Sequence, residues 1–149
     1  MQLNLPFLPQ ILSCKNLLIA GLGGGFDIFC GLPLYFELQN IGLNVHLANF
    51  SFSDIISLKN GAIAGWNCGF SLSDSLVGVT SETESLNYYF PELYLSQWFK
   101  EFKQENVTVW CFHKTGVVDL TRNYRLLINH LNIDGIILVD GGVDSLIIG

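Results

Sequence analysis

The sequence predicts a single α/β domain over residues 1–149 with a mainly parallel sheet, and three observations support this prediction. Apolar runs of strand length alternate along the chain with longer segments of helical length. The first apolar run breaks into a glycine-rich turn, which is how a buried strand commonly leads into a helix. Half of the residues are hydrophobic and the mean hydropathy is +0.41, as expected for parallel strands that are buried on both faces.

Composition and charge argue against several other classes of protein. No run of about 18 apolar residues indicates a membrane span, and the N-terminus lacks the basic segment of a signal peptide. The net charge is −6 and the seven Lys and Arg residues form no cluster, which argues against nucleic-acid binding. The four cysteines form no CxxC pair, so neither a zinc site nor a disulfide framework is expected. We therefore expect a cytoplasmic protein with no membrane or nucleic-acid partner.

The first part of the chain predicts a βαβ unit, whose crossover is right-handed in nearly all proteins. Proline fits only in the first turn of a helix, so the helix either begins near Leu32 or is kinked at Pro33. Gly42 marks the end of this helix. The expected segments are, in order, an apolar arm or short helix (1–14), a strand (16–20), a helix (28–40) and a strand (44–50).

The middle of the chain, residues 51–87, is rich in Ser, Gly, Asn and Asp and predicts either a lid or a surface excursion. Regular patterns return at Pro91, where a helix begins with an apolar face of Leu93, Leu95, Trp98, Phe99 and Phe102. The other expected segments are short β-like pieces (62–66 and 76–80), a strand (107–113), a turn (114–116), a helix (120–131) and a last strand from Ile133 to Asp140.

Polar residues follow each predicted strand, and ligands of open parallel sheets bind outside the carboxyl ends of the strands. We therefore expect these residues to share one rim. They are Gly21, Gly23, Gly24, Gly25 and Asp27 after the first strand, Asn49, Ser51 and Ser53 after the second, His113, Lys114 and Thr115 after the third, and Asp140, Gly141, Gly142, Asp144 and Ser145 after the last.

The loop GLGGGFD, residues 21–27, has the composition of an anion cradle. Glycines let backbone N–H groups approach a phosphate closely, and the start of the next helix favours negative charge. The loop lacks the full GxGxxG pattern because Phe26 takes the last position, and no acidic residue ends the second strand to hold a ribose. The alternative is a tight turn that needs glycine only for its backbone geometry.

The acidic and basic residues of the rim each allow two interpretations. Asp140 and Asp144 are candidate catalytic residues and candidate Mg²⁺ ligands, or residues that cap a helix or stabilise a turn. Asp27 either caps the helix or contacts the ligand. His113 is a candidate general base, because imidazole titrates near neutrality, or a structural histidine. With Thr115, the turn residue Lys114 either contacts phosphate or is simply exposed.

Four separated motifs resemble those of a known family. They are the run LLIAGLGGGFDIFCGLPLYF, the helix start YFPE, the turn TG and the ending VDGGVDSL. Through them the chain resembles, from Leu17 to Leu146, the family catalogued as domain of unknown function eleven-fifty-two, although Phe26 departs from its pattern. The resemblance implies a Rossmann-like three-layer fold and no particular reaction. The family pattern continues past this ending, so we expect the N-terminal part of a longer protein.

Two functional hypotheses follow from the sequence. The first is a protein, with or without enzymatic activity, that binds a phosphate-bearing small molecule, a nucleotide or a sugar phosphate, on the glycine loop opposite Asp140 and Asp144. The second is a non-catalytic binding or protein-interaction module, because high apolarity and low charge density are typical of chains that expose docking surfaces. In the second case a homo-oligomer is one expected assembly.

Overall fold

A computed structural model describes residues 7–55, 70–84 and 89–141, which form an α/β fold around a six-stranded mixed sheet. The strand order is β3-β4-β5-β2-β1-β6. The elements are, in chain order, α1 (Leu8–Leu12), β1 (Asn16–Gly21), α2 (Asp27–Cys30), α3 (Leu32–Asn40), β2 (Asn44–Ser51), β3 (Phe70–Ser73), β4 (Leu76–Val79), α5 (Pro91–Trp98), the π-helix η1 (Phe99–Lys103), β5 (Val109–His113), α6 (Val117–Leu131) and β6 (Gly135–Val139).

Four strands of the sheet are parallel, and the prediction of an α/β fold is confirmed. β5, β2, β1 and β6 lie side by side in parallel, whereas β3 and β4 form an antiparallel hairpin that pairs with β5. The β-like piece expected at residues 76–80 is β4, and the piece expected at 62–66 lies outside the described residues. The sequence did not predict β3.

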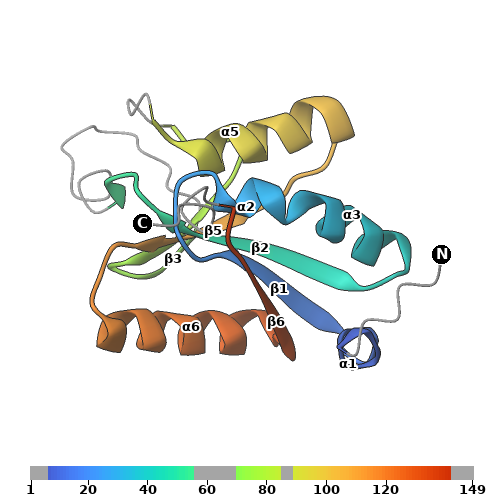
Figure 1. Cartoon of the computed structure of the whole chain (residues 1–149). Helices are drawn as coiled ribbons and strands as arrows, with labels where there is room; N and C mark the ends of the chain where they lie inside the picture. The colour runs from blue at the N-terminus through green and yellow to red at the C-terminus, as the bar shows by residue number, and fades with distance from the viewer. Residues whose placement is uncertain (1–6, 56–69, 85–88, 142–149) are drawn as a thin grey trace, which may run out of the picture.

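Helices cover both faces of the sheet. Figure 1 shows α3 and α5 on one face and α6 on the other. The first face packs around Leu17, Ile19 and Leu47, and the second around Leu18, Ala20 and Ala48, because neighbouring side chains of a strand point to opposite faces. β1 and β2 therefore carry apolar side chains on both faces of the sheet, as the composition predicted.

The helix after the glycine loop is divided at Gly31, so the expected break near Pro33 is confirmed. α2 ends at Cys30, and α3 begins at Leu32 with its proline in the first turn. A Cβ at Gly31 would lie 2.6 Å from Cγ2 of Ile19 in β1. Glycine therefore lets this helical segment pack directly on the strand.

The helix that begins at Pro91 does not bury its whole predicted apolar face. Leu93, Leu95 and Phe99 are buried, but Trp98 and Phe102 are 36% and 65% exposed. The prediction was wrong for these two. Trp98 is the last residue of α5, and Phe102 lies in the π-helix that follows it. Its i→i+5 hydrogen bonds add residues to the turn, which rotates later side chains away from the face that a 3.6-residue period predicts.

The three C-terminal elements, β5, α6 and β6, match their expected positions with small shifts. α6 begins at Val117, three residues before the expected Leu120, with Gly116 as its extended N-cap. Its predicted apolar side is confirmed, because Leu127 is buried and Leu120, Tyr124, Ile128 and Leu131 pack against the same cluster. β5 and β6 are each shorter than expected.

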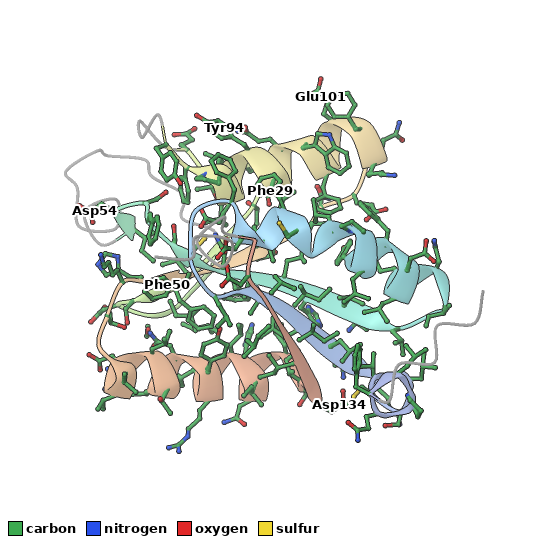
Figure 2. The ribbon with its side chains drawn as sticks, in the orientation of Figure 1. Phe29, Phe50, Asp54, Tyr94, Glu101 and Asp134 are labelled. Atoms are coloured by element: carbon green, nitrogen blue, oxygen red, sulfur yellow. The ribbon has the colours of Figure 1, made fainter. Side chains whose placement is uncertain are left out.

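β6 is held against β1 at the amino edge of the sheet by Asp134, which Figure 2 shows beside α1. Its carboxylate accepts hydrogen bonds from the backbone N–H groups of Lys15 at 2.8 Å and Asn16 at 2.9 Å, and these bonds lower the pKa of Asp134. β6 is an edge strand, with Ile136 and Leu138 exposed. This strip favours the interaction-module hypothesis.

We predict that Gly31→Ala destabilises the fold by up to about 2 kcal/mol. Alanine gains about 1 kcal/mol of helix propensity over glycine, but overpacking costs about 1–3 kcal/mol. Ile19 is fully buried and β-branched, so its methyl group cannot swing away. The measurement is urea denaturation. Gly116→Ala is the control, because nothing lies within 4 Å of its Cβ position, and it should change stability by less than about 0.5 kcal/mol. Equal effects of both variants would contradict the packing explanation.

Candidate functional site

The strand order places the loops after β1 and β6 next to each other. Along the chain the parallel strands add outward from β1 to β2 and β5, and then β6 adds on the other side of β1. Such a reversal is the point where open α/β sheets leave a crevice at their carboxyl edge. The glycine loop and Asp140–Gly141 follow the two strands that meet there.

The carboxylate of Asp27 joins these two loops. Its Oδ2 accepts a hydrogen bond from the N–H of Gly23 at 2.5 Å, and its Oδ1 accepts one from the N–H of Gly141 at 3.2 Å. The side chain is 7% exposed. Asp27 therefore supplies the negative charge that the loop's N–H groups favour, and the N–H of Gly23 is already used.

The glycines of the loop are required by close packing and by backbone geometry. Gly24 and Gly25 have φ values of +89° and +60°, which side chains rarely adopt. A Cβ at Gly24 would lie 2.6 Å from the ring of Phe52, and one at Gly21 would lie 2.1 Å from Oδ1 of Asn49. The alternative interpretation of the loop, a turn that needs glycine for its geometry, accounts for these positions.

Beneath the loop lies a buried pair, Asn49 of β2 and Glu92 of α5. Nδ2 of Asn49 donates to Oε1 of Glu92 at 2.8 Å and to the backbone oxygen of Gly25 at 2.9 Å. Neither residue has measurable exposure. Burial raises the pKa of Glu92, and the hydrogen bond from Asn49 opposes this shift.

Cys111 of β5 is the register partner of Asn49 and completes this buried row. Burial raises the pKa of its thiol well above the ordinary value, and the negative charge of Glu92 adds to the shift. A thiol of this kind is inert as a nucleophile, because the thiolate is the reactive form. Cys111 is therefore a packing residue.

Four buried side-chain polar atoms have no hydrogen-bond partner among the described residues, and all four lie at this end of the sheet. Native proteins satisfy nearly all buried polar groups, so such a concentration is typical of a functional site. The atoms are Oδ1 of Asn49, Oε2 of Glu92, Nδ1 of His113 and Oγ1 of Thr115.

A pocket of about 380 Å³ opens at the carboxyl ends of β2 and β5. His113 ends β5 and pairs in register with Ser51 of β2, so both strands supply part of the wall. Figure 2 shows Asp54 at this edge of the sheet. The pocket is lined by Ser51, Phe52, Ser53, Asp54, His113 and Lys114.

A larger pocket of about 560 Å³ lies at the opposite, amino edge, beside His46 and His130. Burial lowers the pKa of His46, which keeps its imidazole neutral. None of the four unpartnered buried atoms belongs to a residue that lines this pocket. We therefore place the candidate site at the carboxyl edge, where the polar chemistry is concentrated.

The structure brings most of the predicted rim residues to one edge. Asp140 approaches the glycine loop, because its Oδ1 would lie 3.6 Å from a Cβ at Gly23. His113, Lys114 and Thr115 lie at the neighbouring end of β5. Three predicted residues, Gly142, Asp144 and Ser145, lie outside the described residues. Their roles remain predictions.

The described residues contain no group of three His, Cys, Asp or Glu side chains that would hold a metal ion. The predicted Mg²⁺ site used Asp140 together with Asp144, which is not described. It therefore stays a prediction. In the same part of the chain, no helix is both long and apolar enough to cross a membrane.

Comparisons of the chain with protein-family models, with curated proteins and with solved structures found no match. The resemblance to the family catalogued as domain of unknown function eleven-fifty-two therefore stays a prediction, and the site must be interpreted from its own geometry.

Sequence reasoning missed two features of this edge. Glu92 follows Pro91 in the first turn of a helix, where an acidic residue is expected for the helix dipole alone. Phe52 occurs in a segment without a clear period, and Tyr89 belongs to the YFPE helix start, which indicates no ligand contact. One signal was available: Asn49 is a polar residue inside an apolar strand, and a buried amide requires a partner.

We predict that Asp27→Asn destabilises the protein by about 1–3 kcal/mol. Both carboxylate oxygens of Asp27 accept a hydrogen bond from a backbone N–H. The asparagine side chain has only one oxygen, and its NH₂ group cannot accept, so one buried hydrogen bond is lost. Chemical denaturation measures this loss. The control is Asp119→Asn, which removes an exposed pair with Arg122 and should cost less than about 1 kcal/mol. If Asp27→Asn is as stable as the wild type, the hydrogen bonds of Asp27 to Gly23 and Gly141 contribute nothing to stability.

We predict a pH dependence of stability from Glu92. Its pKa in the folded protein is above the ordinary value of 4.5, so the folded state binds this proton more tightly than the unfolded state. Stability from this group is fully present below pH 4.5 and is lost as the pH rises through the raised pKa. In thermal melts, Glu92→Gln should therefore gain stability relative to the wild type as the pH rises above 4.5. Glu101→Gln, at an exposed position, serves as the control. If the stability difference between Glu92→Gln and the wild type does not change with pH, the raised pKa of Glu92 is refuted.

Proposed function

We propose that this protein binds a phosphate-bearing small molecule at the carboxyl edge of its sheet, in the pocket between the ends of β2 and β5. One observation carries the proposal. The buried polar atoms without partners among the described residues are concentrated at this edge, and one of them, Nδ1 of His113, belongs to a residue that lines the pocket. Incompletely paired polar groups beside a pocket are typical of a site that binds a polar ligand.

The chemistry of the pocket suits a phosphate next to Lys114. Its ammonium group is the one cationic side chain among the described lining residues, and lysine binds phosphate as a point charge. Oγ of Ser53 already donates to the backbone oxygen of Tyr89 at 2.8 Å. The hydroxyl of Ser51 hydrogen-bonds to Glu92, so Lys114 is the phosphate donor in this proposal. The carboxylate of Asp54 would repel a phosphate beside it, so it suits the hydroxyl groups of the ligand.

The glycine loop takes a different part in this proposal from the one that the sequence predicted. Its Gly23 N–H donates to Asp27, so we place the phosphate in the neighbouring pocket and give the loop the role of a wall. Phe52 belongs to both, because its ring packs on Gly24 and lines the pocket. For catalysis, His113 is our candidate for proton transfer, since it is the imidazole in the pocket.

We also propose that the fold is Rossmann-like, with three layers. The parallel strands lie in the order third, second, first, fourth, which is how one half of such a sheet meets the start of the other. Helices on both faces support the same assignment (Figure 1). In folds of this kind the carboxyl edge is the usual place for a phosphate-bearing ligand.

The proposal predicts that a phosphate compound stabilises the protein and that Lys114→Gln weakens its binding roughly ten- to hundredfold, because a charge-assisted contact contributes about 1.5–3 kcal/mol. Thermal shift and calorimetry with inorganic phosphate, ribose 5-phosphate and adenosine monophosphate test this. Ligand at a hundred times its Kd should stabilise by about 2.7 kcal/mol.

Lys100→Gln is the matched control, because this exposed lysine contacts Asn106, before the start of β5. It should bind the ligand as the wild type does. If none of the three compounds raises the melting temperature, or if both lysine variants lose affinity equally, the proposed function fails.

A further inference from the structure

Three exposed aromatic rings lie around the glycine loop, beside the pocket. Phe26, Phe52 and Tyr89 are 60%, 53% and 45% exposed. They come from three separate segments: the loop after β1, the segment after β2 and the residues before α5. Large apolar side chains that gather at a polar site are typical of ligand-binding surfaces. We call these three residues the aromatic shelf.

Contacts with one another and with the glycine loop hold the three rings together. The rings of Phe26 and Tyr89 meet edge to face with centroids 6.0 Å apart. The Cβ positions of Gly24 and Gly25 lie 2.6 Å from Cε1 of Phe52 and 2.9 Å from Oη of Tyr89, so both rings rest on the loop. Oγ of Ser53 donates to the backbone oxygen of Tyr89 at 2.8 Å, which ties the two outer segments to each other.

The size of the shelf favours a small molecule over a protein partner. An aromatic side chain presents about 150–250 Å², so three rings that are about half exposed offer roughly 300 Å². A stable protein interface needs about 800 Å² on each partner. A planar ring stacked on the shelf needs far less, and every nucleobase has such a face.

We propose that the aromatic shelf stacks against a nucleobase, so that the ligand is a nucleotide rather than a sugar phosphate. This inference rests on the proposed function, because the phosphate would lie in the pocket beside Lys114. Nζ of Lys114 lies 6.0 Å from the centroid of the Phe52 ring, a gap that the ribose of a nucleotide can bridge. One ligand can therefore reach both features.

The test compares four probes on the full chain by calorimetry: adenosine monophosphate, uridine monophosphate, ribose 5-phosphate and adenosine. Both nucleotides should bind roughly tenfold tighter than ribose 5-phosphate, which is the scale of base stacking on an aromatic ring. Phe26 does not line the pocket. Phe26→Leu should therefore remove most of this difference and leave ribose 5-phosphate binding unchanged. Phe52→Leu is the second variant and should lower the same nucleotide-to-sugar ratio.

Phe102→Leu is the matched control, because Phe102 is equally exposed but lies on η1, outside the shelf. Equal affinities for nucleotides and ribose 5-phosphate, or an unchanged ratio in both shelf variants, would overturn the nucleobase inference and leave the phosphate pocket standing. Binding of adenosine without any effect of phosphate would support the shelf and refute the pocket. If no probe binds, both proposals are wrong.

Discussion

The carboxyl edge of the sheet depends on the two hydrogen bonds that the carboxylate of Asp27 accepts. It accepts hydrogen bonds from Gly23 and Gly141, in loops that are far apart along the chain and adjacent across the strand reversal. At the other end of the same two strands, Asp134 accepts bonds from Lys15 and Asn16. An acidic side chain thus joins β1 and β6 at each edge, and backbone N–H groups are the partners in both cases.

With its position fixed by Asp27, the glycine loop lies directly on the groups beneath and beside it. Asn49 reaches up to the backbone of Gly25, and Phe52 packs on Gly24. A Cβ at Gly24 or Gly25 would push against Phe52 or Tyr89, and one at Gly21 would push against the buried Asn49. Because the glycines have no side chains, only the loop backbone covers Asn49, which is fully buried.

The candidate site combines two kinds of surface. One is a polar pocket with a lysine, a histidine and two serine hydroxyls. The other is the aromatic shelf, which shares Phe52 with the pocket. A molecule with one charged end and one planar end matches this combination better than a purely polar or purely apolar one does.

By itself, the sequence determined the α/β class, the break near Pro33, the apolar side of α6 and the edge where polar residues collect, because each depends on local periodicity or on residues that follow a strand. Only the tertiary structure decided the roles of Asp27, Glu92 and Phe52. Each depends on a partner from another segment: Gly141 for Asp27, Asn49 for Glu92 and Gly24 for Phe52. The π-turn at Phe99 was likewise hidden, since its effect on Phe102 comes from backbone hydrogen bonding that side-chain spacing does not encode.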